Sequence, residues 1–197
     1  MRGIQKNFIT LVLILLLVVP LPVSGAMFRA DPRHSGVYDP GPVPTNNNLL
    51  WTFDKQNKPI TAPAIADGTV YFGSEDTNIY ALFAANGTER WRYSTGGRVR
   101  SAPSVADGIV CSGSADGYIY GIDAADGSLR WKVLTGPGND GVGYSAPAID
   151  SGTAYIVSFD RNLYAIDTGS GFVKWKFPFI SSSTSEAESS PAVADGI

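Results

Sequence analysis

The sequence contains a single cysteine, Cys111, and a single histidine, His34. One cysteine cannot form a disulfide within the chain, and it cannot supply the several thiolates of a structural zinc site. A free cysteine in an apolar stretch usually packs as a small core residue, and we expect this of Cys111. His34 has no partner at a catalytic or metal-ligating spacing along the sequence, so neither residue indicates an active site.

Charged residues and helix-favouring runs are also scarce. Charged residues make up 17% of the chain, give a formal net charge of -3 and form no basic stripe. Nucleic acid is therefore not expected as a partner. Glycine is abundant, with 22 residues, and hydrophobic residues reach 44%. This composition predicts a packed all-β fold rather than a disordered chain.

A short apolar run, Phe8 to Val19, lies near the N-terminus, after two basic residues and before small residues that end at Ala26. This layout is typical of a secretory signal peptide, and the run is shorter than the roughly 20 residues of a membrane span. We therefore expect residues 1–26 to be a signal peptide and the protein to be secreted, displayed on the cell surface or held in the periplasm or envelope. Membrane contact is expected only through this segment, if it stays uncleaved.

A unit of 30 residues that runs from Ala-Pro to Trp occurs three times without gaps. The copies are Ala62–Trp91, Ala102–Trp131 and Ala146–Trp175. A fixed period of about 40 residues indicates an array of small supersecondary units. Such units stack on one another, because each cannot bury its apolar surface alone.

Four short β-type segments, separated by turn residues, make up the second copy. The predicted strands cover residues 102–106, 109–112, 118–123 and 128–133. Asp107-Gly108 stands between the first two, and Asp-Gly is a strong hairpin signal. Four short antiparallel strands form one blade of a β-propeller. The three copies therefore predict blades at about 61–95, 101–135 and 145–179.

Parts of two further blades flank these copies. Trp51 lies 40 residues before Trp91, so Leu49–Phe53 is predicted to be the last strand of an earlier unit, and residues 189–197 repeat the start of a unit. Three full blades are fewer than the 4–8 that propellers usually have. Residues 27–197 are therefore expected to form an incomplete, truncated β-propeller, whose exposed edge strands invite self-association.

Three aspartates recur in the loop between the second and third strands: Asp76, Asp116 and Asp160. Aspartate side chains commonly accept hydrogen bonds from their own loop backbone, and we expect this here. The sequence has no Asp-x-Asp-x-Asp-Gly pattern of a calcium loop, which is the spacing that such a site requires. No metal ligands are therefore predicted.

The end of each copy resembles the tryptophan-docking motif, A-x-D-x-x-T-G-x-x-x-W, of the PQQ-like (pyrroloquinoline-quinone-type) repeat propellers. The matching segments are Ala81–Trp91, Gly121–Trp131 and Ala165–Trp175, with Phe83 in place of the motif's aspartate. The resemblance covers nearly all of residues 27–197 and implies that the tryptophans pack between adjacent blades. The residues to which it assigns a structural role are Trp51, Trp91, Trp131, Trp175, Gly87, Gly127, Gly171, Asp123 and Asp167.

The resemblance implies more than one kind of activity. The family contains PQQ-dependent alcohol and sugar dehydrogenases, and also propellers without a cofactor, such as a scaffold subunit of the outer-membrane β-barrel assembly machinery. The dehydrogenases are much longer, many have adjacent cysteines, and their calcium-site residues have no counterpart that we can align. The preferred hypothesis is an exported, non-catalytic binding or scaffold module without a cofactor, which contacts other envelope proteins or a surface ligand. The alternatives are part of a dehydrogenase that uses PQQ and calcium, or a glycan-binding propeller at the cell surface.

The loops that connect one copy to the next vary most, and loops on a rigid scaffold commonly carry function. Together with the loops at Glu75 and Asp160, they are expected to gather on one face. No pair of residues in these loops forms a recognisable catalytic set, so no catalytic residue is predicted. The candidate ligand-binding residues are Arg98, Arg100, Asn139, Asp140, Tyr144, Arg161, Glu186 and Glu188.

Overall fold

The computed structural model describes residues 49–54, 58–136, 143–179 and 189–193. These residues form three four-stranded antiparallel sheets, in each of which the strands follow chain order. The all-β expectation is therefore confirmed. None of the described residues belongs to a helix of the length and apolar character that a membrane span requires.

The three sheets correspond to the three sequence copies. The first sheet contains β1 (Ala64–Ala66), β2 (Thr69–Gly73), β3 (Asn78–Phe83) and β4 (Glu89–Ser94). The second contains β5 (Ser104–Ala106), β6 (Ile109–Gly113), β7 (Tyr118–Asp123) and β8 (Leu129–Leu134). The third contains β9 (Ala148–Asp150), β10 (Thr153–Ser158), β11 (Asn162–Asp167) and β12 (Val173–Pro178).

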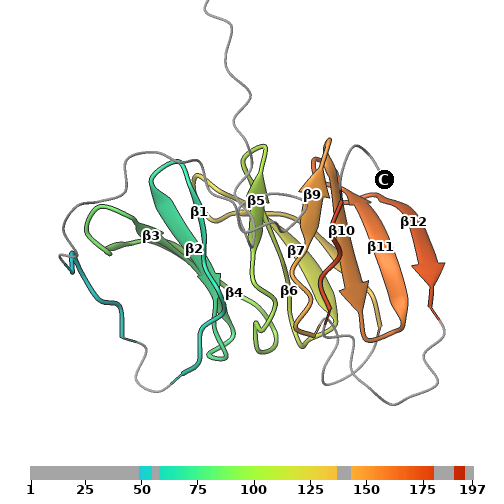
Figure 1. The fold of residues 1–197 in the computed structure, drawn as a ribbon, viewed down its shortest axis with the longest axis horizontal. Coiled ribbons are helices and arrows are strands. Elements are labelled where there is room, and N and C mark those ends of the chain that lie inside the picture. Colours follow the sequence, from blue (N-terminus) through green and yellow to red (C-terminus); the bar gives the residue numbers. More distant parts are fainter. Residues whose placement is uncertain (1–48, 55–57, 137–142, 180–188, 194–197) are drawn as a thin grey trace, which may run out of the picture.

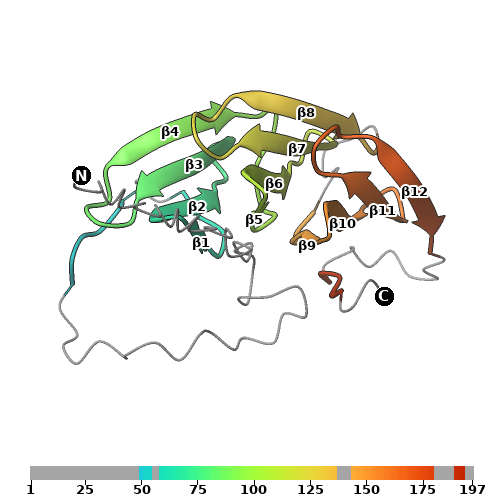
Figure 2. The same ribbon diagram turned by 90° about the horizontal axis from the view of Figure 1, so that it is seen from above.

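The sheets are arranged as successive blades of an arc. They stand side by side in Figure 1, and the view from above in Figure 2 places β1, β5 and β9 on the inner side and β4, β8 and β12 on the outer side. The chain crosses from the outer strand of one sheet to the inner strand of the next. This is the arrangement of blades in a β-propeller.

Two-residue turns join the first two strands of each blade. In the first two blades the turn is Asp67-Gly68 and Asp107-Gly108, and all four residues have positive φ, between 45° and 74°. Positive φ at both central positions defines the type I′ turn, which matches the twist of a hairpin. The predicted hairpins are therefore present, although β5 begins at Ser104 rather than at residue 102. Pro103 precedes it, and proline has no N–H to donate to the strand ladder.

Two predicted strands at the ends of the repeat array are absent from the described residues. Leu49–Phe53 has no assigned strand, and neither do residues 189–193, while 194–197 lie outside the description. A strand needs a neighbour for its backbone hydrogen bonds, and the described chain offers none at either position. Trp51 and Phe53 instead pack their side chains against the first sheet.

The core consists of layers between adjacent sheets. Ile79 and Trp91 of the first sheet are buried with Val105 of the second. Cys111 and Trp131 of the second sheet are buried in a cluster with residues of the third. The second sheet thus packs with both of its faces, because the alternating side chains of a strand point to opposite sides.

Cys111 is expected to be unreactive in the native protein. Its side chain is fully buried, and burial raises the pKa of the thiol to about 12. Since the thiolate is the nucleophile, a thiol reagent at pH 8 should label almost none of the folded protein. Labelling should become complete in denaturant, as measured by mass spectrometry. Rapid labelling without denaturant would contradict the buried position.

Candidate functional site

The recurring aspartates hold the loops at one end of the blades. Asp116 accepts hydrogen bonds from the Tyr118 N–H at 3.0 Å and from the Tyr120 hydroxyl at 2.6 Å. It also accepts one at 2.7 Å from the Gly96 N–H, which lies in the connection leaving the first sheet. Burial and this carboxylate raise the pKa of Tyr120. The carboxylate therefore fastens its own loop and joins two blades.

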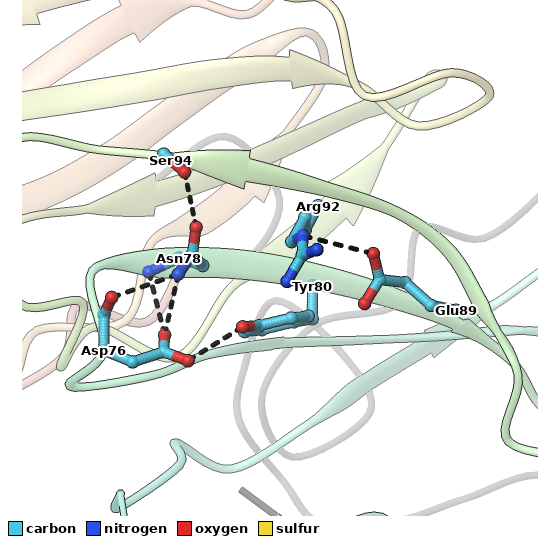
Figure 3. Close-up of polar contacts among 6 residues, drawn as sticks. All are labelled: Asp76, Asn78, Tyr80, Glu89, Arg92 and Ser94. Atoms are coloured by element: carbon cyan, nitrogen blue, oxygen red, sulfur yellow. Dashed lines mark hydrogen bonds and ion pairs between the residues drawn. The ribbon is translucent and has the colours of Figure 1, made fainter.

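The same arrangement occurs in the first blade, as Figure 3 shows. Asp76 accepts hydrogen bonds from the Asn78 N–H at 3.1 Å and from the Tyr80 hydroxyl at 2.8 Å. The Asn78 side chain in turn accepts one from the Ser94 hydroxyl at 2.6 Å. In the third blade Asp160 binds Tyr164 in the same way. These contacts give the aspartates the predicted role of holding their loops.

Three tryptophans make the same contact with the blade that follows. The indole N–H of Trp51 donates to the Ala84 carbonyl at 2.8 Å, that of Trp91 to the Ala124 carbonyl at 3.0 Å, and that of Trp131 to the Thr168 carbonyl at 2.6 Å. Each indole also lies against the glycine of the receiving turn, Gly87, Gly127 and Gly171 respectively. A side chain on any of these glycines would overlap the ring. Glycine thus provides the room for the indole.

The motif aspartates stabilise the receiving turns. Asp123 accepts a hydrogen bond from the Ala125 N–H at 2.8 Å and pairs with Arg130 at 3.1 Å. Asp167 pairs with Lys174 at 3.4 Å, and hydrogen bonds from Ser170, followed by the lysine charge, lower the pKa of Asp167.

Phe83 takes the place of the aspartate in the first blade, where the motif is interrupted. The Arg90 guanidinium lies over the Phe83 ring, 5.7 Å from its centroid. A cation–π contact thus takes the place of the ion pair that the other two blades make at this position.

Trp175 differs from the other tryptophans. The resemblance predicts that it packs between blades, but its side chain is 46% exposed, whereas Trp91 and Trp131 are each 7% exposed. It lies on the side of the third sheet that faces away from the second, and it contacts Tyr155 at 5.9 Å between ring centroids. The described residues contain no blade after the third, so the docking of Trp175 between blades stays a prediction.

Two arginines, a glutamate and a tyrosine from three different loops come together. The Arg100 Nε lies 2.9 Å from one carboxylate oxygen of Glu75, and the Arg98 guanidinium lies 3.9 Å from the other. The Arg100 guanidinium also lies over the Tyr144 ring, 5.5 Å from its centroid. We call these four residues the arginine cluster. Its residues come from the β2–β3 loop, the β4–β5 connection and the β8–β9 connection.

The arginine cluster contains three of the predicted ligand-binding residues and one residue, Glu75, that was not among them. Val99, which lies between the two arginines, is 1% exposed and anchors their connection in the core. Arg161 is exposed in the β10–β11 turn and has positive φ, and it is not part of the cluster. The other predicted ligand-binding residues lie outside the described residues: Asn139, Asp140, Glu186 and Glu188. His34 and the expected signal peptide also lie outside them.

Among the residues that the structure describes, no three histidine, cysteine, aspartate or glutamate side chains come together as potential metal ligands.

The blades, their docking tryptophans and their receiving glycines define the chain as part of a β-propeller built of PQQ-like repeats. The family model described as outer membrane protein assembly factor BamB matches residues 41–196. The chain belongs to this family.

Solved structures with the same fold come from both groups of propellers. The BamB structure from Moraxella catarrhalis is 24% identical with a TM-score of 0.53, over 60% of this chain and 36% of that chain. Quinohemoprotein alcohol dehydrogenase ADHIIG from Pseudomonas putida HK5 is 25% identical with a TM-score of 0.53, over 59% of this chain and 20% of that chain. A europium-containing methanol dehydrogenase is 20% identical with a TM-score of 0.56, over 66% of this chain and 26% of that chain.

The chain therefore aligns with well under two thirds of each of these structures. A search of curated proteins gave no significant match.

Proposed function

We propose that this chain is part of an exported, non-catalytic propeller that acts as a binding or scaffold module in the cell envelope. Membership of a family described as an outer membrane assembly factor supports a scaffold role. The apolar run before Ala26 supports export. The arginine cluster is the observation that carries the proposal, because it gives one face of the blades a surface suited to a protein partner.

The composition of the arginine cluster suits protein recognition. Arginine and tyrosine are enriched in protein interfaces, where they often supply much of the binding energy. The Arg100 side chain is 22% exposed, and Glu75 and Tyr144 hold it in place from two sides. An interface residue that is held before binding loses less conformational entropy when the partner arrives.

Arg98 is the residue that we assign to direct contact with the partner. Its side chain is 58% exposed, and its nitrogen lies 3.9 Å from the Glu75 carboxylate, which is a loose contact. Exposed ion pairs contribute about 0–1 kcal/mol, so exchanging Glu75 for a carboxylate of the partner costs little. The planar guanidinium then binds the new carboxylate with two parallel hydrogen bonds. The proposed partner therefore presents an acidic side chain to this face.

Substitution of Arg98 by alanine is expected to reduce recovery of the partner from envelope extracts of the native host by roughly tenfold or more, as for other interface arginines. Arg92→Ala is the matched control. Arg92 is 57% exposed, is paired with Glu89 at 3.4 Å and lies on the outer strand β4. Cross-linking followed by quantitative mass spectrometry measures recovery with the wild type and both variants.

Two results would contradict this function. Equal recovery of the partner with Arg98→Ala and Arg92→Ala would show that the arginine cluster is not part of the interface. Reduction of a dye by the protein with alcohols or sugars, after addition of PQQ and calcium, would instead indicate a dehydrogenase. The two assays are independent, so each tests a separate part of the proposal.

A further inference from the structure

The turn between β3 and β4 carries an asparagine that has no part in the arginine cluster. Asn86, Gly87 and Thr88 form the pattern Asn-x-Ser/Thr with a middle residue other than proline, and the sequence contains this pattern once. The pattern is the acceptor of N-linked glycans in secreted proteins, where it lies in a surface loop. The structure meets this requirement, because Asn86 and Thr88 are both exposed in the turn.

Hydrogen bonds establish which atom of the Asn86 amide is the bound one. Its Oδ1 accepts from the Thr88 N–H at 3.0 Å and from the Thr88 hydroxyl at 2.8 Å. A backbone N–H only donates, so the atom that it contacts is the amide oxygen. Among the residues that the structure describes, Nδ2 of Asn86 donates no hydrogen bond. The nitrogen to which a glycan is attached is therefore accessible.

Packing between blades does not cover this turn. Trp51 already lies against Gly87, and Asn86 is exposed beside it. The equivalent residue of the second blade, Asp126, is also exposed, although Trp91 docks at its turn and that blade has a sheet on both sides. The position thus faces solvent both with and without a complete neighbouring sheet.

The fold does not require asparagine at this position. In the second blade Asp126 accepts a hydrogen bond from the Ser128 N–H at 2.9 Å. In the third blade the Ser170 hydroxyl accepts one from the Phe172 N–H at 3.3 Å. Carboxylate, hydroxyl and amide oxygens therefore close the same turn. The amide nitrogen is what distinguishes the first blade, and it adds no hydrogen bond to the turn.

We propose that Asn86 is a glycan acceptor, to which a transferase of the cell envelope adds an oligosaccharide carried on a lipid phosphate. In this transfer Nδ2 forms a bond to the anomeric carbon of the first sugar and loses one proton. The bond between that carbon and the phosphate oxygen breaks, and the lipid phosphate leaves with the electron pair. This role rests on export, which is part of the proposed function.

The glycan lies at the opposite end of the blade from the arginine cluster. Successive connections of an antiparallel sheet alternate between its two ends, so the β1–β2 and β3–β4 turns share one end. The Ala84 N–H donates to the Gly68 carbonyl at 2.8 Å between these two turns. Glu75 and Arg98 lie in the β2–β3 loop and the β4–β5 connection, at the other end. A glycan on Asn86 therefore leaves the arginine cluster accessible to a protein partner.

Two reciprocal substitutions in the full chain test this role, and both keep the turn closed. Asn86→Asp retains an oxygen acceptor, as Asp126 does in the second blade, but removes the amide nitrogen. Asp126→Asn completes the same pattern with Gly127 and Ser128. Wild type and variants are produced in the native host, and the envelope and secreted fractions are separated from the cytoplasm. Mass spectrometry of the tryptic peptide that ends at Arg90 detects a sugar on the first turn.

We expect the exported wild type to carry the added sugar mass on Asn86 and Asn86→Asp to lose it completely. Asp126→Asn should gain a second modified turn. Thr88→Ala should lose the sugar and Thr88→Ser should keep it, because the pattern requires a hydroxyl at its third position. Circular dichroism establishes that each variant is folded.

Two results would contradict this role in different ways. An exported wild-type protein whose Asn86 carries no sugar would overturn the glycan assignment and leave the proposed function intact. Wild-type protein found only in the cytoplasm would overturn export, and the glycan assignment with it.

Discussion

Replacing Trp131 with alanine is expected to lower the free energy of unfolding by about 3–5 kcal/mol, the range for truncation of a buried large aromatic side chain. Trp131 lies between the second and third sheets and is 7% exposed. Its loss leaves a cavity beside Gly171 and removes the partner of the Thr168 carbonyl. A buried carbonyl without a hydrogen bond adds to the cost of the cavity. Urea unfolding followed by circular dichroism measures the change.

Trp175→Ala is the control for this prediction. The two tryptophans occupy the same position of the repeat, but Trp175 is 46% exposed. Substitutions at exposed positions usually change stability by about 0.5 kcal/mol or less, so Trp175→Ala should cost far less than Trp131→Ala. Similar losses for both variants would show that the repeat position, rather than burial between sheets, determines the contribution of the tryptophan.

Replacing Gly127 with alanine should destabilise the protein through two effects. Its φ is +77°, and the left-handed conformation costs a residue with a Cβ atom about 1–2 kcal/mol. A Cβ atom there would also lie 2.8 Å from Cδ2 of Trp91, which forces the docked ring to move, and such overpacking costs about 1–3 kcal/mol. The total loss should therefore exceed that of a backbone effect alone.

Gly108→Ala separates the two effects. Gly108 has φ of +74°, but a Cβ atom there has no atom within 4 Å. Its substitution should show the backbone cost only, and the difference between the two variants measures the packing of Trp91. Thermal or urea unfolding of both variants provides the comparison. Equal stabilities would mean that the Trp91 ring moves aside without cost.

Local sequence signals predicted much of the blade. Asp107-Gly108 predicted a hairpin because the backbone conformation of that turn depends on the two residues themselves. Asp116 was likewise expected to hold its own loop, and two of its hydrogen-bond donors lie within four residues. Its third donor, Gly96, comes from the neighbouring blade, and nothing local in the sequence indicates that contact.

Features that depend on distant segments were harder to predict. Leu49–Phe53 is in register with the last strand of the repeat, but a strand forms only beside a partner. Trp175 matches its equivalents in sequence, and only the absence of a described neighbouring sheet distinguishes it. The loop at Glu75 was expected on the same face as the candidate loops, but the contact of Glu75 with Arg100 was not predicted. It spans 25 residues and depends on how the β4–β5 connection crosses between two sheets.

The layered core has a consequence for how the protein opens. In stacked repeats stability is close to a sum of unit terms and nearest-neighbour terms. Among the residues that the structure describes, the second blade has a sheet on both sides, whereas the first and the third each have one on a single side. Local opening of the described blades should therefore reach β6 and β7 last. Copies that share the same repeat motif thus differ in how often their backbone hydrogen bonds open, because they differ in the number of neighbouring sheets.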